Sequence, residues 1–424
     1  MIPKRARFID YWAGNAICLI VSFIYNLTRI LPRKIKSSTP NKILFLELSE
    51  MGSAILSYPA MNMVKERYPD AEIYFWIFDE NADGVRVLDI IPEDRIITTR
   101  CDNPYALIWD TLKNIVKIRK IRIDTIIDME LFSRFSSILV SASGALRKAG
   151  FYRFSFEGLY RASVYTHKVM YNPYIHISRN FINLASAISE ESRPWAIPKR
   201  PLDEKPLCLP VIKPDLGAQK RLHDKLAADK KDSIKNKTIV VMNPGLGDPI
   251  SIRKWPIENY GKLAKKFCVD KDMFVVLIGK NAPTSRESRI ITDVLGSEGV
   301  INLIGKTDAK ELLELFRIAS LFISHDSGAV NFASLTDIGI IVLFGPETPT
   351  IYAPLAINKT VIYKKFTCSP CLSAYNHRAS SCRDNRCIKQ ISAEEVYEKA
   401  IRHLDKKWKD DVNIMSGNTV FNIT

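Results

Sequence analysis

The stretch LFISHDSGAVNFASLTDIGIIVLFGPETP, residues 321–349, decides the fold of this chain. Leu321 to Ser324 and Ile338 to Phe344 are short apolar runs typical of buried strands, and 329–335 has the spacing of a helix. The Asp-Ser-Gly sequence at 326–328 suits a tight turn or a helix N-cap. A turn of this kind, at the carboxyl end of a strand, is where α/β sheets bind anions. Taken alone, the stretch also fits an ordinary turn with a capping Asp.

The same alternation of strands and helices continues on both sides of this stretch. In the N-terminal half we expect strands at 42–48, 72–78, 95–98 and 125–127 and helices at 54–68, 105–119 and 133–142. In the C-terminal half we expect further strands at 238–242 and 274–279 and helices at 257–268, 284–295, 309–319 and 392–405. Such alternation predicts parallel, doubly wound sheets in an α/β protein. Neither half carries G-x-G-x-x-G or a P-loop, which argues against a dinucleotide dehydrogenase or a P-loop NTPase.

The chain length of 424 residues suits two domains of ordinary size. A stretch rich in Pro, Lys and Asp with little periodicity, 190–236, is the natural place for a linker. We therefore expect a membrane-associating helix and linker at 1–40, a Rossmann-like domain at 41–190, a linker at 191–236, a second Rossmann-like domain at 237–405 and a tail at 406–424. Two such domains facing each other would leave a cleft between the carboxyl ends of their sheets.

The N-terminal segment has the composition of a membrane-binding helix. Tyr11 to Thr28 carries no charge, while residues 1–36 hold seven Lys or Arg against Asp10 alone. A helix in the headgroup plane of an anionic membrane fits best. A helix docked on the protein itself and a transmembrane span are the alternatives. No small-residue cleavage site follows, so we expect no removed signal peptide and a cytoplasmic setting.

Positive charge is concentrated a second time at residues 131–180. This stretch holds seven basic residues against Glu157 alone and ten aromatic residues. Basic and aromatic side chains together suit a phosphorylated glycolipid, through ion pairs and stacking on sugars. Core aromatics under a solvated basic face are the plainer interpretation. We expect no nucleic-acid partner, because no known binding module is present.

Four of the eight cysteines cluster near the end of the chain, at Cys368, Cys371, Cys382 and Cys387. The Cys-x-x-Cys pair followed by two more thiols is similar to a structural zinc site, although the second pair is spaced more widely than usual. Free thiols, zinc and a disulfide all remain open. We interpret the cluster as a means of holding a loop, with no part in the chemistry.

Five segments, taken in order, resemble glycosyltransferase family 9, whose best-known members are the lipopolysaccharide heptosyltransferases. They are LELSEMGSAILSYPAM (46–61), MNPGLGDPISIRKWPIENYGKLA (242–264), LIGKTDAKELLELF (303–316), HDSGAVNFA (325–333) and LFGPETP (343–349). The resemblance covers roughly residues 42–405. It implies the GT-B fold, two Rossmann-like domains in which the C-terminal one holds most of the nucleotide-sugar donor.

The resemblance also implies roles for individual residues on the donor side. Lys254 matches a family lysine that contacts the donor phosphates, and a cation there suits a diphosphate leaving group. The turn at 326–328 matches the family's D-[ST]-G turn, Lys306 and Thr307 match a loop near the base and ribose, and Gly345 borders the donor pocket. The expected donor set is Asn243, Gly245, Lys254, Gly279, Lys306, Thr307, Asp326, Ser327, Gly328, Ala329, Asn331 and Gly345.

Two positions depart from the family pattern. Ser53 stands where the family commonly has the Asp that serves as base, and serine cannot act as a base unaided. Glu50 is the nearest carboxylate in the same loop, and we assign it and Lys254 the catalytic roles; a solvated loop carboxylate is the alternative for Glu50. Asn331 replaces a family His and loses its titration near neutral pH. We expect Gly52, Ser53 and Arg134 on the acceptor side.

The sequence thus predicts an inverting, metal-independent glycosyltransferase at the cytoplasmic face of a bacterial inner membrane, active in cell-envelope biosynthesis. It would move a sugar such as heptose from a nucleotide diphosphate to a lipid-linked saccharide and require no cofactor. A non-catalytic GT-B scaffold that binds nucleotide-sugar or glycolipid in a membrane assembly is the alternative. A sugar-nucleotide epimerase on the same fold is a third class.

Overall fold

The computed structural model describes residues 4–28, 39–152, 160–193, 195–230, 237–245, 250–270, 273–280, 293 and 299–405. The chain divides into two compact units. Unit 1 is Met1–Cys208 with Ala374–Arg378, and unit 2 is Leu209–Ser373 with Ala379–Thr424. Except for Asp293, the helix expected at 284–295 lies outside the described residues, and so does the expected tail at 406–424.

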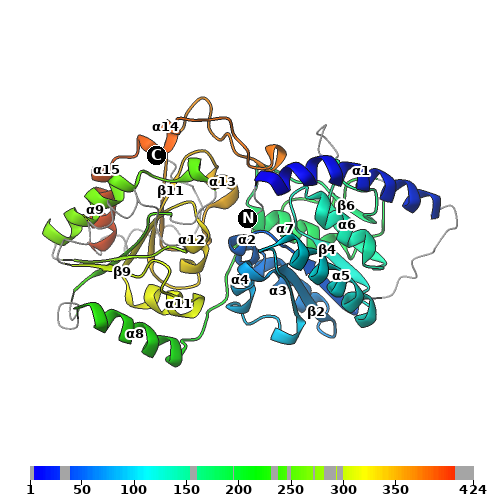
Figure 1. Cartoon of the computed structure of the whole chain (residues 1–424), viewed down its shortest axis with the longest axis horizontal. Coiled ribbons are helices and arrows are strands. Elements are labelled where there is room, and N and C mark those ends of the chain that lie inside the picture. The colour runs from blue at the N-terminus through cyan, green and yellow to red at the C-terminus, as the bar shows by residue number, and fades with distance from the viewer. Residues whose placement is uncertain are drawn as a thin grey trace. The chain divides into compact units, whose positions relative to one another are not determined.

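Unit 1 is built on a six-stranded parallel sheet with the order β3-β2-β1-β4-β5-β6 (Figure 1). Its strands are β1 (Lys42–Leu46), β2 (Glu72–Phe78), β3 (Ile96–Thr99), β4 (Thr125–Asp128), β5 (Arg147–Phe151) and β6 (His167–Val169). Its helices are α1 (Lys4–Thr28), α2 (Met51–Leu56), α3 (Tyr58–Arg67), α4 (Asp83–Arg86), α5 (Pro104–Ile121), α6 (Arg134–Ala142) and α7 (Ile177–Ala187). The central strands β1 and β4 are buried at every residue except Lys42, as expected for strands covered by helices on both faces.

Unit 2 has a second six-stranded parallel sheet with the order β9-β8-β7-β10-β11-β12, which repeats the strand order of unit 1. Its strands are β7 (Ile239–Asn243), β8 (Phe274–Leu277), β9 (Val300–Asn302), β10 (Leu321–His325), β11 (Gly339–Phe344) and β12 (Lys359–Tyr363). Its helices are α8 (Leu216–Lys230), α9 (Ile257–Asp270), α11 (Ala309–Ile318), α12 (Gly328–Ala333), α13 (Pro349–Tyr352), α14 (Arg386–Lys389) and α15 (Ala393–Leu404). In both units the order reverses between the first and fourth strands, β1 and β4 or β7 and β10.

Two local expectations from the sequence differ from the structure. The single helix expected at 54–68 is two helices, α2 and α3, that meet at Ser57, because Pro59 at the start of α3 cannot donate a backbone hydrogen bond. The expected linker contains α8, which packs on α11. Arg221 and Lys225 of α8 both pair with Glu311, and Ala218, Leu222 and Leu226 form a narrow buried stripe on the same helix.

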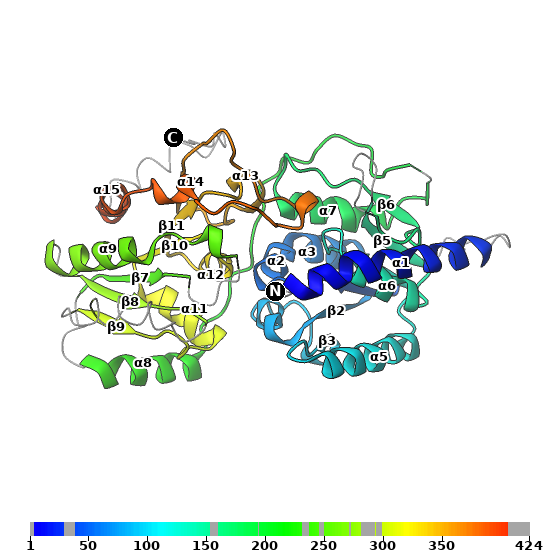
Figure 2. The same ribbon diagram turned by 45° about the horizontal axis from the view of Figure 1, so that its top comes forward.

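Helix α1 lies along α6 on unit 1 (Figure 2). Gly14, Cys18 and Ser22, spaced by four residues, form its buried seam. Ser22 Oγ accepts the backbone N–H of Ser163 at 2.9 Å, so the seam is hydrogen-bonded as well as packed. Among the described residues α1 contains the one stretch, Phe8–Leu27, that is long and apolar enough to cross a membrane by length and composition.

Candidate active site

In unit 2 the turn after β10 lies beside the end of β7. Asn243 Nδ2 donates to Ser327 Oγ at 3.2 Å, and the Asn243 side-chain oxygen accepts the N–H of Gly245 at 2.9 Å. Ser327 Oγ is also 2.9 Å from Ser324 Oγ. Open α/β sheets bind ligands where the strand order reverses, and β7 and β10 are the two strands at that point. Three predicted donor residues, Asn243, Gly245 and Ser327, are therefore brought together.

Position 245 requires glycine because of its backbone conformation and because of the nearby His325 ring. Its φ is +79°, in the region that favours glycine, and a Cβ added there would lie 2.2 Å from Cε1 of His325. The His325 ring is fully buried, and the backbone N–H of His325 donates to the Tyr260 hydroxyl at 3.0 Å. The loop after β7 thus rests directly on the last residue of β10.

An arginine not singled out from the sequence ties this turn to the next loop. Arg253 Nη1 lies 3.2 Å from a carboxylate oxygen of Asp326 and 3.0 Å from one of Glu347. Burial, and then the charge of Asp326, raise the pKa of Glu347 well above its usual value, against the opposing effect of Arg253.

Lys254 follows Arg253 at the end of a short 3₁₀ turn, Ser251–Arg253, and its side chain is half-buried. The next residue anchors the segment, because the buried Trp255 indole donates to the carbonyl of Ile391 at 2.8 Å. The sequence did carry a signal for both residues. Arg253 is a charged residue next to the predicted Lys254, and Glu347 is a charged residue two positions after the predicted Gly345.

The loops after β8 and β9 carry three more of the predicted donor residues. The N–H of Gly305 donates to the carbonyl of Gly279 at 2.8 Å, which joins the two loops at the same sheet edge. Lys306 is exposed, and Thr307 precedes the Asp308 cap of α11. Gly279, Lys306 and Thr307 are therefore neighbours.

The last predicted donor residues differ in their surroundings. Gly328 is exposed at the start of α12, Ala329 is half-buried, and the side-chain oxygen of Asn331 is buried with no hydrogen-bond partner in the part of the chain that the structure describes. Gly345 is buried, and a Cβ there would lie 2.7 Å from Cβ of Ile388. Glycine at position 345 thus allows Ile388 of α14 to pack closely against the backbone.

In unit 1 the loop after β1 carries the predicted base. Ser53 Oγ donates to a carboxylate oxygen of Glu50 at 2.8 Å, and the other oxygen of Glu50 pairs with Arg378. Gly52 lies between these residues in the first turn of α2. Arg378 belongs to the short segment that joins unit 1 from late in the chain, where Tyr375 packs against Phe132 and Tyr171. No sequence signal pointed to Arg378, because 328 residues separate it from Glu50.

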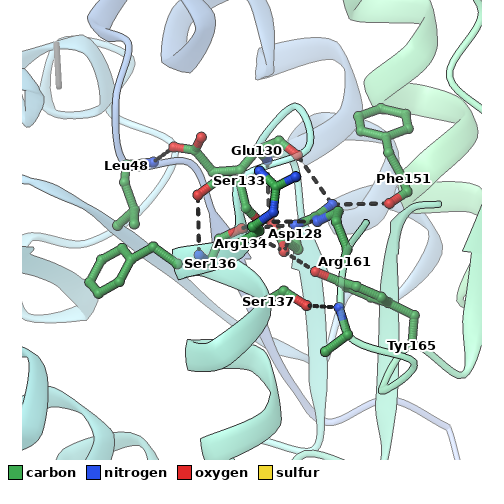
Figure 3. Close-up of polar contacts among 12 residues, drawn as sticks. Leu48, Asp128, Glu130, Ser133, Arg134, Ser136, Ser137, Phe151, Arg161 and Tyr165 are labelled. Atoms are coloured by element: carbon green, nitrogen blue, oxygen red, sulfur yellow. Dashed lines mark hydrogen bonds and ion pairs between the residues drawn. The ribbon is translucent and has the colours of Figure 1, made fainter. Parts of the chain in front are cut away.

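Glu130, after β4, holds the loop after β1 in place (Figure 3). One of its carboxylate oxygens accepts the N–H of Leu48 at 2.8 Å, the N–H of Ser49 at 3.0 Å and the Ser49 hydroxyl at 2.9 Å. Burial, with a contribution from Asp128, raises the pKa of Glu130 above its usual value. Burial and the charge of Glu130 likewise raise the pKa of Glu47 well above its usual value.

Asp128, at the end of β4, anchors a fully buried polar network (Figure 3). The Arg161 guanidinium pairs with its carboxylate, which also accepts the Tyr165 hydroxyl at 2.6 Å and the Ser136 hydroxyl at 3.0 Å. A buried ion pair survives only when hydrogen bonds satisfy its remaining atoms, as they do here. Asp128 and Arg161 are therefore structural groups.

The structure places the Arg134 side chain beneath α1, out of contact with solvent. There Nε donates to Asn15 at 2.6 Å, and the guanidinium lies 3.6 Å from Asp10 and over the Tyr11 ring. Burial under a helix leaves no path to a saccharide, so we correct our assignment: Arg134 docks α1 onto unit 1.

All eight cysteines are free thiols. Burial, and then the neighbouring Cys371, Cys368 and Cys382, raise the pKa of Cys387 to about 11, so the four clustered thiols lie near one another. Among the described residues, however, no group of three or more His, Cys, Asp or Glu is arranged to hold a metal ion. The Pro346 carbonyl accepts the N–H groups of Cys371 and Leu372 at 2.9 Å, so this loop is held by its backbone.

Solved structures share this fold. A glycosyl transferase family 9 protein from Veillonella parvula superposes with a TM-score of 0.65 at 17% identity, covering 87% of this chain and 98% of that one. The E. coli ADP-heptose lipopolysaccharide heptosyltransferase II gives 0.63 at 17% identity, covering 87% and 99%. The two doubly wound units are thus those of a GT-B protein, as predicted.

The family is also established by sequence. Residues 112–380, more than half of the chain, match the profile of glycosyltransferase family 9 (heptosyltransferase), and the chain belongs to that family. A lipooligosaccharide heptosyltransferase 2 from Haemophilus influenzae is 30% identical over 26% of this chain and 32% of its own length. The Campylobacter jejuni protein of the same name is 25% identical over 38% of this chain and 50% of its own length. The chain thus matches half or less of the length of these two curated relatives.

Proposed function

We propose that this protein is a glycosyltransferase that moves a sugar such as heptose from a nucleotide diphosphate to a lipopolysaccharide-type or other lipid-linked glycan. The observation that carries the proposal is the turn of Asp326 and Ser327 beside Asn243, at the reversal point of the unit 2 sheet. Family membership and relatives named lipooligosaccharide heptosyltransferase support heptose as the sugar.

On the donor side, unit 2 would bind the nucleotide diphosphate. Lys254, next to the paired Arg253, would approach the phosphates, and the backbone N–H groups of Ser327 and Gly328 would donate hydrogen bonds to the phosphate oxygens. As the bond from the anomeric carbon to the diphosphate breaks, negative charge grows on the leaving group, and a lysine ammonium stabilises it. We propose that no metal ion is needed, since these cationic and amide groups suffice.

On the acceptor side, unit 1 would supply the base. Ser53 holds the position of the family Asp and donates its hydroxyl hydrogen bond to Glu50, so the pair together could replace that residue. Glu50 would take the proton of the acceptor hydroxyl, whose oxygen attacks the anomeric carbon from the face opposite the diphosphate, with inversion. Arg378 occupies the other oxygen of Glu50 and would orient the carboxylate.

A transfer assay with ADP-heptose and lipid-linked acceptor tests the proposal. We expect Glu50→Gln to lower kcat by about 10² to 10⁴ while nucleotide binding is retained, since this is the usual contribution of a general base. Glu66→Gln, a change at an exposed carboxylate of α3, should leave kcat unchanged. Transfer that is equally fast in Glu50→Gln and wild type would refute the role of Glu50.

The second candidate is a non-catalytic scaffold that binds nucleotide-sugar or glycolipid in a membrane assembly. It is favoured by Ser53 and Asn331 in place of the usual Asp and His, and by the Arg378 pair that engages Glu50. Binding of ADP or UDP without turnover of any ADP- or UDP-sugar would support the scaffold. For either function the proposed location is the cytoplasmic face of the inner membrane, with α1 on anionic lipid.

A further inference from the structure

Helix α5 of unit 1 has an apolar face that is exposed in the part of unit 1 that the structure describes. Five exposed residues form this face, at the spacing of one helical stripe: Tyr105, Ile108, Trp109, Leu112 and Val116. The opposite side packs on the sheet, where Ile118 is fully buried and the Asn114 amide donates to the carbonyl of Thr98. A surface helix of an α/β protein normally presents polar residues to water, so a second apolar stripe indicates an interaction site.

The α5 stripe lies on the same face of the sheet as α1. Side chains of α1, α5 and α6 enter one apolar core over this face, and Arg119 Nε at the end of α5 donates to the Ala142 carbonyl at the end of α6 at 2.7 Å. Both ribbon views show α6 between α1 and α5 (Figures 1 and 2). The exposed apolar residues of α1 are Phe8, Ile9, Tyr11, Trp12, Ile17, Leu19, Ile20, Phe23, Ile24 and Leu27.

The charges of the two helices favour an anionic partner. The sole acid in α5, Asp110, is held by Arg100 through two hydrogen bonds, and the sole acid in α1, Asp10, accepts the N–H of Phe135. The exposed charged residues of α5 are all cations: Lys113, Lys117, Arg119 and Lys120. Apolar stripes edged by cations and carrying Trp and Tyr are typical of helices that lie in a membrane interface.

We propose that α1 and α5 together form a membrane-binding face, with α5 as a second contact that enters the interface of an anionic bilayer beside α1. This proposal adds a second contact to the membrane binding proposed above for α1, and it depends on that binding. The seam of α1 argues for a docked helix: a spanning helix would have to leave the contacts of Asp10, Asn15 and Ser22 with unit 1. Binding through α5 also fixes the orientation of unit 1 on the surface.

Vesicle co-sedimentation of the full-length protein tests the inference, in the absence of nucleotide and acceptor so that the result does not depend on transfer. We expect binding to phosphatidylcholine vesicles that contain phosphatidylglycerol, and weaker binding without the anionic lipid or at high salt. Trp109→Ser with Leu112→Ser should weaken the partition coefficient by about tenfold, because both side chains lose their burial in the interface.

Matched controls separate the outcomes. Tyr105 on α5 and Tyr174 elsewhere on unit 1 have nearly the same exposed fraction, 86% and 83%. Tyr105→Ser should weaken vesicle binding, and Tyr174→Ser should not. If Phe23→Ser on α1 weakens binding and the α5 variants do not, the role of α5 is refuted while the proposed membrane partner stands. If the wild-type protein binds no vesicle, the proposed membrane binding is refuted. The proposed glycosyltransferase activity is then still tested by transfer to a soluble acceptor.

Self-association is the competing use of the α5 stripe. Sedimentation velocity without lipid should give the same oligomeric state for wild type and the Trp109→Ser, Leu112→Ser variant. A dimer that dissociates in this variant would overturn the inference, because the stripe would then join two copies of the chain.

Discussion

The two units have the same strand order, but the groups at their reversal points differ. In unit 2 the Asn243 amide reaches Ser327, Gly245 lies on His325, and Arg253 pairs with Asp326. In unit 1 buried carboxylates join the two strands: Glu130 after β4 holds the loop after β1, and Asp128 pairs with Arg161. The comparison teaches that one topology can place a polar turn, here the proposed donor site, or a fully buried ion-pair network at the same edge.

The largest effect should come from breaking the buried network of unit 1. Asp128→Asn leaves the fully buried guanidinium of Arg161 without its charge partner, and such changes cost about 3–5 kcal/mol. In unit 2, Asp326→Asn leaves Arg253 its contact with the Glu347 carboxyl group, so we expect a smaller loss than in Asp128→Asn. Urea unfolding of both full-length variants measures the difference; equal losses would contradict the contrast between the units.

A pair of glycines tests the close contact at the unit 2 edge. Gly144 and Gly245 have φ values of +81° and +79°, but the nearest atom to an added Cβ is 4.0 Å away at Gly144 and 2.2 Å away at Gly245. Gly144→Ala should therefore cost only the left-handed strain of about 1–2 kcal/mol. Gly245→Ala adds overpacking of about 1–3 kcal/mol against His325. Thermal unfolding measures both, and the account fails if the two variants are equally stable.

The buried carboxyl of Glu47 should make the stability of unit 1 depend on pH. Its folded pKa is raised, so the folded state holds the proton above the pH at which the unfolded chain releases it. The contribution of Glu47 to the free energy of unfolding is therefore most favourable in acid. It falls as the pH rises from about 4.3, the pKa of glutamate in the unfolded chain, toward the folded pKa. Glu47→Gln keeps the shape without the charge and should raise the melting temperature at pH 8 but not at pH 4. A variant less stable than wild type at pH 8 would contradict the raised pKa.

The smallest expected effect is at the turn itself. Ser327→Ala removes the hydroxyl that joins Asn243 and Ser324, at a cost of about 1 kcal/mol. Ser334→Ala, which removes a hydrogen bond to the Val330 carbonyl within the same region, should cost a similar amount. Because the Ser327 hydroxyl holds the turn whose backbone belongs to the proposed donor site, only Ser327→Ala should weaken ADP binding in calorimetry. Equal affinities for the two variants would remove Ser327 from that site.

The sequence predicted the parts of the fold that local patterns determine. Apolar runs such as 42–48 and 321–324 are strands, and the Asp-Ser-Gly turn follows β10 as expected. Strands β5 and β6 were missed because Lys148, Gly150 and His167 interrupt their apolar character. Helix α8 was missed because its buried stripe consists of only Ala218, Leu222 and Leu226, and hydrophobic periodicity does not report its charged contacts with Glu311.

Side-chain partners were harder to predict, because they depend on residues distant in sequence. Glu50 and Ser53 were grouped correctly by their spacing, but the pairing of Glu50 with Arg378 joins distant parts of the chain. A basic residue near aromatics suggested a glycolipid contact for Arg134, whereas α1 covers it. Charge and aromatic content alone cannot distinguish a ligand site from an internal ion pair.

The central claim is that unit 2 binds a nucleotide diphosphate at the turn after β10, with Lys254 at the phosphates. Calorimetric titration of ADP into the full-length protein tests it most directly, with Lys254→Ala and the exposed Lys262→Ala of α9 as a matched pair. We predict one site whose Kd rises by about tenfold or more, roughly 1.4 kcal/mol, in Lys254→Ala and is unchanged in Lys262→Ala. Absence of ADP binding by the wild type, or equal affinity in Lys254→Ala, would contradict the claim.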